Sequence, residues 1–198
     1  MEAVAAAIGS RIPSEGSVVD LGAGTGLASQ GCVARGRLVV GVDSSEHMLE
    51  RAVAAGRISR ALCADATATG LPTAGFGAVV CANILHLHPH PARVLDEAVR
   101  LVRPGGVLVV TTPSPRVSLA AVARAERECG TPWARVARGW MGRVGVALMA
   151  PGAVRPAPTA AVVRQVGEAI SRHGLSPAAV SELYGVQTLM VMHSPAAP

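Results

Sequence analysis

Two acidic residues flank a run of glycines in the first quarter of the chain. Residues 18–26 read VVDLGAGTG, and the following segment RLVVGVD ends at Asp43. Gly22, Gly24 and Gly26 let the backbone turn sharply and approach a ligand where a side chain would collide. A carboxylate at a strand end, such as Asp43, can accept two hydrogen bonds from a ribose diol. This spacing predicts a crevice that binds a nucleoside.

The spacing of the glycines separates two kinds of nucleoside ligand. Dinucleotide-binding loops follow G-x-G-x-x-G, whereas this loop is G-x-G-x-G and has Leu27 where the third glycine would fall. Asp20 precedes the loop, where its charge would repel a pyrophosphate and attract an ammonium group. S-adenosylmethionine carries a ribose, an ammonium group and a sulfonium, so it fits both acidic residues. We therefore expect S-adenosylmethionine rather than NAD.

The chain resembles the class I S-adenosylmethionine-dependent methyltransferases in six blocks that follow one another in order. They are VVDLGAGTG, VVGVDSSEHMLERA, ALCADATATGLP, FGAVVCANILHLHP, VLDEAVRLVRPGGVLVVTTPSP and YGVQTLMVMHSP. The resemblance is strong over residues 15–115 and weaker over 159–193. It implies an enzyme that transfers a methyl group to an O, N or C atom of a small molecule, for which a secondary metabolite is one candidate. A protein that binds S-adenosylmethionine without transferring its methyl group is an alternative.

The order of the expected elements favours one α/β domain over residues 1–198. Strands alternate with helices, which indicates a doubly wound, mostly parallel sheet, and its ligands bind beyond the carboxyl ends of the strands. The last two strands form a hairpin, so that a Rossmann-like sheet of seven strands with one antiparallel C-terminal strand results, as in the resembled family. The expected strands are 17–21, 38–42, ALCAD, GAVVCAN and GVLVVTT, with helices near 3–8, 27–34, after Ser45 and at PARVLDEAVRLV.

The resemblance implies a cofactor-binding role for residues at the strand ends. Asp43 would bind the ribose hydroxyls, with capping of the next helix as the alternative. Met48 would pack on the adenine, with core packing as the alternative. Asp65 would bind the adenine amino group and Asn83 the methionine portion, whereas turn residues are the alternative for both. The full set is Asp20, Gly22, Ala23, Gly24, Gly26, Asp43, Ser44, Met48, Asp65, Ala66 and Asn83.

Three histidines, His86, His88 and His90, follow the fourth expected strand. Histidine titrates near neutrality and can take a proton from an acceptor hydroxyl or amine. His86 is the candidate catalytic base, and His193 in the terminal hairpin is a weaker one. The prolines beside His90 prevent a helix, and no carboxylate accompanies the three histidines in the sequence. We therefore expect no metal ion.

Residues 113–158 fit neither a strand nor a helix of the alternating pattern, and prolines open and close the stretch. In the resembled family, insertions after the fifth strand often cover the acceptor pocket, so this stretch is the candidate lid. Its arginines leave other partners open, namely a nucleic acid, or a carboxylate, phosphate or carrier protein that presents the acceptor. They are Arg116, Arg124, Arg127, Arg135, Arg138 and Arg143.

The amino-acid composition limits the possible binding partners of the protein and its possible cellular compartment. The net charge is +5, but only 2% of the residues are aromatic, which argues against stacking on nucleic acid and favours a small-molecule acceptor. The four cysteines form no CxxC pair, as expected for buried thiols in a reducing compartment. No apolar run reaches the ~18–20 residues that span a bilayer, and the first residues lack the basic start of a signal peptide. We therefore expect a cytoplasmic protein and leave its oligomeric state open.

Overall fold

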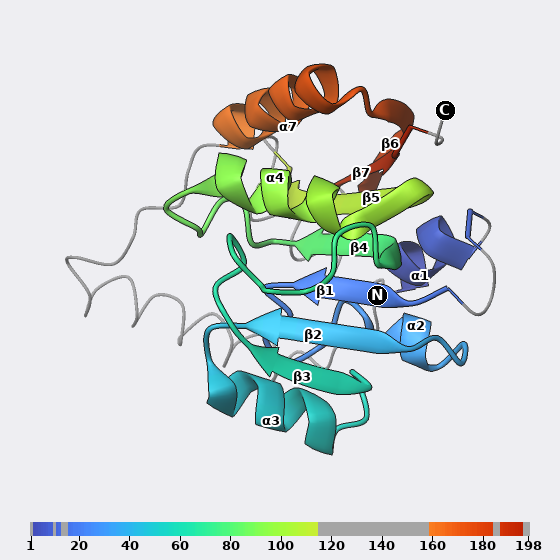
Figure 1. Ribbon diagram of the computed structural model, residues 1–198, viewed down its shortest axis with the longest axis vertical. Coiled ribbons are helices and arrows are strands. Elements are labelled where there is room, and N and C mark those ends of the chain that lie inside the picture. Colours follow the sequence, from blue (N-terminus) through green and yellow to red (C-terminus); the bar gives the residue numbers. More distant parts are fainter. Residues whose placement is uncertain (1, 10, 13–15, 115–158, 184–186, 196–198) are drawn as a thin grey trace, which may run out of the picture.

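The structure is a computed structural model that describes residues 2–9, 11–12, 16–114, 159–183 and 187–195 (Figure 1). These residues form a seven-stranded sheet with the order β3-β2-β1-β4-β5-β7-β6. The chain starts in the middle of the sheet, winds to one edge and returns to the other, so the predicted doubly wound topology is confirmed. The strands are β1 Val18–Leu21, β2 Val39–Asp43, β3 Arg60–Cys63, β4 Phe76–Ala82, β5 Val102–Pro113, β6 Ser176–Leu183 and β7 Gln187–His193.

The direction of the last strands also follows the prediction. The pairs β1–β2, β2–β3, β1–β4 and β4–β5 are parallel. β7 lies between β5 and β6 and is antiparallel to both. β7 is therefore the single antiparallel strand in this sheet, and β6 runs in the same direction as β1 to β5.

Helices cover both faces of the sheet (Figure 1). One face packs against α4 and α7, and the opposite face packs against α1, α2 and α3. Within the described part of the chain, none of the helices has the length and apolar character needed to cross a membrane. The helices are α1 Glu2–Gly9, α2 Gln30–Val33, α3 Glu46–Ala54, α4 Pro91–Leu101 and α7 Thr159–His173.

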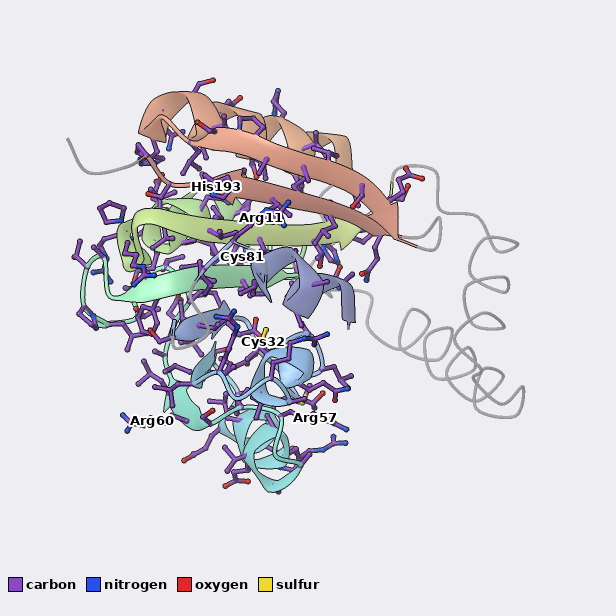
Figure 2. The ribbon with its side chains drawn as sticks, turned by 90° about the vertical axis from the view of Figure 1, so that its right-hand side faces the viewer. Arg11, Cys32, Arg57, Arg60, Cys81 and His193 are labelled. Carbon is purple, nitrogen blue, oxygen red and sulfur yellow. The ribbon has the colours of Figure 1, made fainter. Side chains whose placement is uncertain are left out.

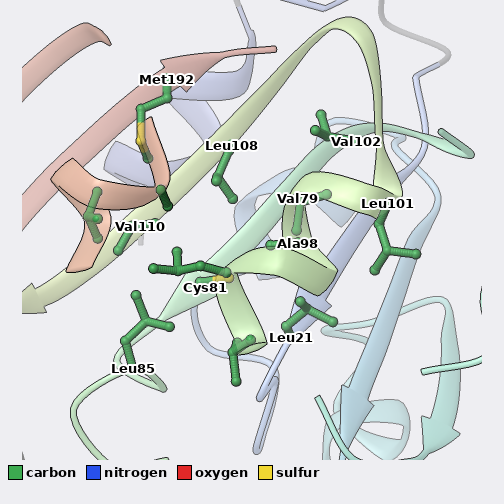
Figure 3. Packing of buried hydrophobic residues seen from close by; sticks show 14 of the residues in the cluster. Leu21, Val79, Cys81, Leu85, Ala98, Leu101, Val102, Leu108, Val110 and Met192 are labelled. Atoms are coloured by element: carbon green, nitrogen blue, oxygen red, sulfur yellow. The ribbon is translucent and has the colours of Figure 1, made fainter. Parts of the chain in front are cut away.

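The central strands are buried on both faces, which explains their uninterrupted apolar sequences. Within β4, Val79 and Cys81 point into the cluster beneath α4 and α7, whereas Ala78 and Val80 point into the opposite cluster. Figure 3 shows the first cluster, in which Leu101 of α4 and neighbouring side chains pack on β4 and β5. This two-sided core holds the strand ends, and the loops that leave them, in fixed positions.

The helix after the glycine run is shorter than predicted. A helix was expected near 27–34, but α2 comprises only Gln30–Val33. Gly26 has a φ of 73°, which interrupts a right-handed helix. Ser29 stands at the N-cap of α2, but its hydroxyl caps nothing in the helix because it donates to the carboxylate of Asp20 instead.

Candidate cofactor-binding site

The glycine run is tied to the carboxyl end of β2 by backbone and side-chain bonds. The amides of Gly22 and Ala23 donate to the carbonyl of Val42 at 2.8 and 2.9 Å. The amide of Gly24 donates to Oδ2 of Asp43 at 2.8 Å. The first two strand ends of the predicted crevice therefore meet, as the sequence indicated, and Asp43 is the side chain that joins them.

The carboxylate of Asp43 has a structural role of its own. Its Oδ1 accepts the amide of Ser45 at 2.9 Å, and Ser45 in turn caps α3 by accepting the amide of Met48. The capping residue is therefore Ser45 rather than Asp43. Because each carboxylate oxygen has two lone pairs, both oxygens of Asp43 can accept a further hydrogen bond from a ribose.

The three glycines serve different purposes. A Cβ on Gly22 would lie 2.6 Å from the Ile84 side chain, and one on Gly26 would lie 2.8 Å from Cβ of Arg57. These two positions are closed by packing, and Arg57 (Figure 2) also donates to the carbonyl of Thr25. Gly24 has a φ of 53°, and a Cβ there would meet no atom within 4 Å. Gly24 is therefore the position at which the loop leaves room for a ligand.

Asp20 is fully buried behind the loop, with an exposed fraction of 0%. One carboxylate oxygen accepts the hydroxyl of Ser29, and Oδ1 is buried without a partner. Burial raises the pKa of Asp20 to about 7, and the charge of Asp43 adds to this effect while the Ser29 bond opposes it. With this raised pKa, Asp20 is only partly ionised near pH 7. Ser29 is a supporting residue that no local sequence pattern had indicated.

Asp65 lies in the link that follows β3. Its Oδ1 accepts the amide and the hydroxyl of Thr67 at 2.7 and 2.6 Å. These bonds hold the pKa of Asp65 below its usual value. Nε2 of His88 lies 3.7 Å from the same oxygen, and Nδ1 of His88 accepts the amide of His90 at 3.0 Å. The predicted histidine cluster therefore divides, because His88 faces the link after β3.

The loop after β4 carries two buried polar atoms without partners. Asn83 has a φ of 58°, and its amide donates to the carbonyl of Thr111 at the end of β5. Oδ1 of Asn83 and Nδ1 of His86 are buried and make no hydrogen bond. Burial lowers the pKa of His86, so its ring is neutral near pH 7 and Nδ1 or Nε2 can accept a proton.

Large apolar side chains are exposed near these strand ends. Leu27 follows the glycines, Met48 begins α3 and Leu87 lies in the loop after β4, with exposed fractions of 47, 38 and 55%. The exposure of Met48 argues against the core-packing alternative. The small neighbours Ala23 and Ala66 are buried, whereas Ser44 is exposed.

Other candidates lie elsewhere or outside the described residues. His193 (Figure 2) pairs with Val107, which puts it toward the amino end of β5 and away from the strand ends that carry Asp43 and Asn83. The candidate lid is outside the description except for Pro113 and Ser114. In the part of the chain that is described, no group of three His, Cys, Asp or Glu residues could hold a metal ion.

The described cysteines are free thiols on separate elements. Cys32 of α2 and Cys81 of β4 are buried (Figure 2). Cys63 of β3 is exposed. Burial raises the pKa of the Cys32 thiol to about 11 and that of Cys81 further still. Thiols with raised pKa values are poor nucleophiles, so Cys32 and Cys81 act as core residues.

The fold and this geometry define a doubly wound α/β protein in which the predicted glycine run, Asp43 and Asn83 lie at the carboxyl ends of the parallel strands. Comparison with known proteins agrees, since residues 19–110 match the family described as "Methyltransferase domain". This match supports a class I methyltransferase, as the sequence resemblance predicted. Similarity to this family implies S-adenosylmethionine as the cofactor.

Individual relatives support the same family. The chain is 35% identical, over 119 residues, to the ubiquinone biosynthesis O-methyltransferase of Dechloromonas aromatica (strain RCB). That match covers 55% of this chain and 50% of the relative, so the chain spans about half the length of the curated relatives it matches.

Solved structures resemble the whole fold. An S-adenosylmethionine-dependent methyltransferase from Mesorhizobium loti is 22% identical with a TM-score of 0.65, covering 95% of this chain and 96% of that one. The cyclase SpnF is 17% identical with a TM-score of 0.65, covering 99% of this chain and 81% of that one. These two likenesses concern the fold alone, because one fold can serve different reactions.

Proposed function

We propose that this protein binds S-adenosylmethionine at the carboxyl ends of its strands and transfers the methyl group to an O, N or C atom of a small molecule. The observation that carries the proposal is the bond between Gly24 and Asp43. It joins an open glycine position to a carboxylate with unused lone pairs, which is the arrangement that a ribose and an adjoining amino acid group require.

The residues present fit the chemistry of this cofactor. Oδ1 of Asn83 and Oδ1 of Asp20 are buried acceptors without partners, and a cationic ammonium group would satisfy such acceptors. The negative charge of Asp43, together with that of Asp20 in its ionised form, also favours a ligand that carries a sulfonium. The exposed side chain of Met48 offers an apolar surface for the adenine ring. Asp65 would accept a hydrogen bond from the adenine amino group.

The chain has two tasks in the reaction, because the bound cofactor supplies a methyl group that is already activated on a sulfonium. The first task is to align the acceptor with the methyl group and to exclude water. The second is to remove the proton of the acceptor, for which His86 is our candidate. Its neutral ring and its unpartnered Nδ1 suit a general base, and it lies in the loop that borders the acceptor side.

The acceptor, partners and location belong to the same proposal. The name of the curated relatives, ubiquinone biosynthesis O-methyltransferase, favours an oxygen as the methylated atom. We propose a small apolar acceptor because Leu27 and Leu87 expose apolar side chains near the site. Residues 113–158 would cover that acceptor as a lid. We assign the protein to the cytoplasm because the described cysteines are free thiols, which a reducing compartment preserves.

Calorimetric titration of the purified protein with S-adenosylmethionine and S-adenosylhomocysteine tests the proposal. We expect both to bind, and we expect label from the methyl-labelled cofactor to appear in a phenolic acceptor chosen from a panel of phenols, amines and carbon acids. Folded protein that binds neither compound would overturn the proposal. Binding without transfer to any acceptor of the panel would favour the alternative of a non-transferring protein.

A further inference from the structure

We propose that Glu97 and Arg100 of α4 are positioning residues that set the recognition of the purine by holding the link between β3 and β4. This inference rests on the proposed function, in which Asp65 of that link binds the adenine amino group. Neither residue belongs to the strand ends, and the sequence assigned neither a binding role, although both lie in the block VLDEAVRLVRPGGVLVVTTPSP. Both act on the cofactor through the link rather than by contact.

The link between β3 and β4 contains no helix among its residues 64–75 (Figure 1). It connects the edge strand to a central strand and must therefore cross the face that α4 covers. Ala66 and Leu71 contact the cluster beneath α4. A segment of this kind lacks the internal bonds of a helix, so its backbone polar groups need partners from other elements.

Glu97 supplies the first set of partners. Its Oε1 accepts the amide of Thr69 at 2.9 Å and the Thr69 hydroxyl at 2.6 Å. The hydroxyl of Thr69 also accepts the amide of Leu71. Glu97 is 7% exposed and Thr69 is 6% exposed, so water competes weakly for these bonds.

Arg100 supplies the second set and holds Glu97 in place. Its Nε and Nη2 donate to the two carboxylate oxygens of Glu97, both at 2.7 Å. Nη2 also donates to the carbonyl of Leu71 at 2.9 Å, and Nη1 donates to the hydroxyl of Thr73 at 2.8 Å. The carbonyl of Arg100 accepts the amide of Ala74. One turn of α4 thus fixes the link from residue 69 to residue 74.

The position of Asp65 depends on this anchoring of the link. Thr67 and His88 approach Oδ1 of Asp65, and no protein partner is recorded for Oδ2 among the residues described. The side chain of Asp65 is 62% exposed, so packing does not hold it. The backbone that bears it is held at Thr67 by the turn and at Thr69 by Glu97. Loss of the bond between Thr69 and Glu97 would therefore make the position of Asp65 less well defined. The other residues of the site would be affected less.

Binding of two ligands that differ at the purine tests the inference. S-adenosylhomocysteine has an amino group that Asp65 can accept from, whereas S-inosylhomocysteine has a carbonyl oxygen that Asp65 would repel. We expect the protein to prefer the adenosyl ligand by about tenfold, the effect of one hydrogen bond to a charged group. We expect Glu97→Gln and Thr69→Val each to reduce this preference to about twofold.

A neighbouring carboxylate of α4 provides the control. Asp96 bonds to Arg172 and His173 of α7, so Asp96→Asn removes the same charge without touching the link and should leave the preference unchanged. The double variant with Asp65→Asn and Glu97→Gln should have the same preference as Asp65→Asn alone, because Glu97 affects the preference only through the carboxylate of Asp65. Urea unfolding of each variant shows which of them are folded. If Glu97→Gln does not fold, the preference measured for Thr69→Val tests the inference.

The possible failures differ from one another. If the unmodified protein binds neither ligand, the proposed function fails and this inference with it. If it binds both equally, or if Glu97→Gln and Thr69→Val weaken both ligands by the same factor, the link does not set purine recognition and the inference alone is overturned.

Discussion

The two halves of the site differ in how fully their polar groups are satisfied. Around the ends of β1 and β2, the amides of the three glycines and both oxygens of Asp43 have hydrogen-bond partners within the protein. Around the ends of β4 and β5, Asn83 Oδ1, His86 Nδ1 and the hydroxyls of Thr111 and Thr112 are buried without partners. Because unpaired buried polar groups are costly, the second half is the one that a ligand would stabilise most.

This difference indicates that the two halves of the site have different roles in binding. The half formed by β1 and β2 is organised by the chain itself and would accept the cofactor with little rearrangement. The half formed by β4 and β5 presents acceptors of hydrogen bonds to groups that the described part of the protein does not supply. Asp20 is the exception in the first half, because it is buried there with one unpartnered oxygen.

Asp43→Ala should break the organised half and have the largest effect. It removes the acceptor of the Gly24 amide and, under the proposed function, the acceptor of the ribose hydroxyls. We expect the affinity for S-adenosylhomocysteine to fall by about a thousandfold, since hydrogen bonds to a charged group are worth ~1.5–3 kcal/mol each. Calorimetric titration measures the change, with Asp96→Ala as the control. An affinity within a factor of about three of the unmodified protein would contradict the ribose assignment.

Asp20→Asn tests the role of the buried Asp20 carboxylate, which has one unpartnered oxygen. The test uses the dependence of protein stability on pH. The folded pKa of about 7 lies above the unfolded value of 3.8, so unfolding releases a proton between these values. Stability is therefore lost as pH rises from about 4 to 7 and stays at the lower level above that. Asp20→Asn removes the ionisation and can still accept the Ser29 hydroxyl. We expect it to raise the free energy of unfolding by about 2–4 kcal/mol at pH 8 and by little at pH 4.

The same variant should lose affinity for the cofactor, because it lacks the charge that attracts the ammonium group. Urea unfolding at the two pH values measures the first effect, and thermal shifts with added S-adenosylmethionine measure the second. An equal change in stability at pH 4 and pH 8 would show that the pKa of Asp20 is the same in the folded and the unfolded protein, and would contradict the raised pKa.

His86→Gln probes the half with unpartnered atoms. We expect kcat to fall by about a hundredfold while the Kd of S-adenosylmethionine changes little. Because burial lowers the pKa of His86, the base stays unprotonated at neutral pH, and activity should decline only below the ordinary histidine range. That decline should disappear in the variant. His90→Gln is the matched control, since His90 is exposed, and a similar loss there would show that the loop rather than a base is responsible.

The contrast between the two halves also explains how much the sequence could predict. The glycine run and Asp43 were predictable because they lie close together in the sequence. Each also stands at the end of a strand that the sequence indicates. The bonds from Glu97 to Thr69 were not, because the two residues are 28 positions apart and an acidic residue on a helix is usually a surface residue. Helix 27–34 was predicted too long because Gly26 has a positive φ, and because the Ser29 hydroxyl bonds to Asp20 instead of capping the helix. The place of His193 could not be predicted, because the register of the hairpin decides which end of the sheet it reaches.

Met48→Ala should give the smallest effect and compares three residues of α3. Met48 is 38% exposed, Val53 is 46% exposed and Leu49 is 2% exposed. If Met48 packs on the adenine, its truncation removes apolar contact worth about 1 kcal/mol and weakens S-adenosylmethionine about fivefold. Stability should change by less than about 0.5 kcal/mol, as for other exposed positions.

The two other residues of α3 separate binding from folding. Val53→Ala removes an exposed apolar group from the same helix and should change neither affinity nor stability. Leu49→Ala creates a cavity in the core and should reduce the free energy of unfolding by about 2–4 kcal/mol. A loss of stability in Met48→Ala without a loss of affinity would return Met48 to the core-packing role. Only the opposite pattern, with affinity lowered and stability kept, assigns its side chain to the ligand.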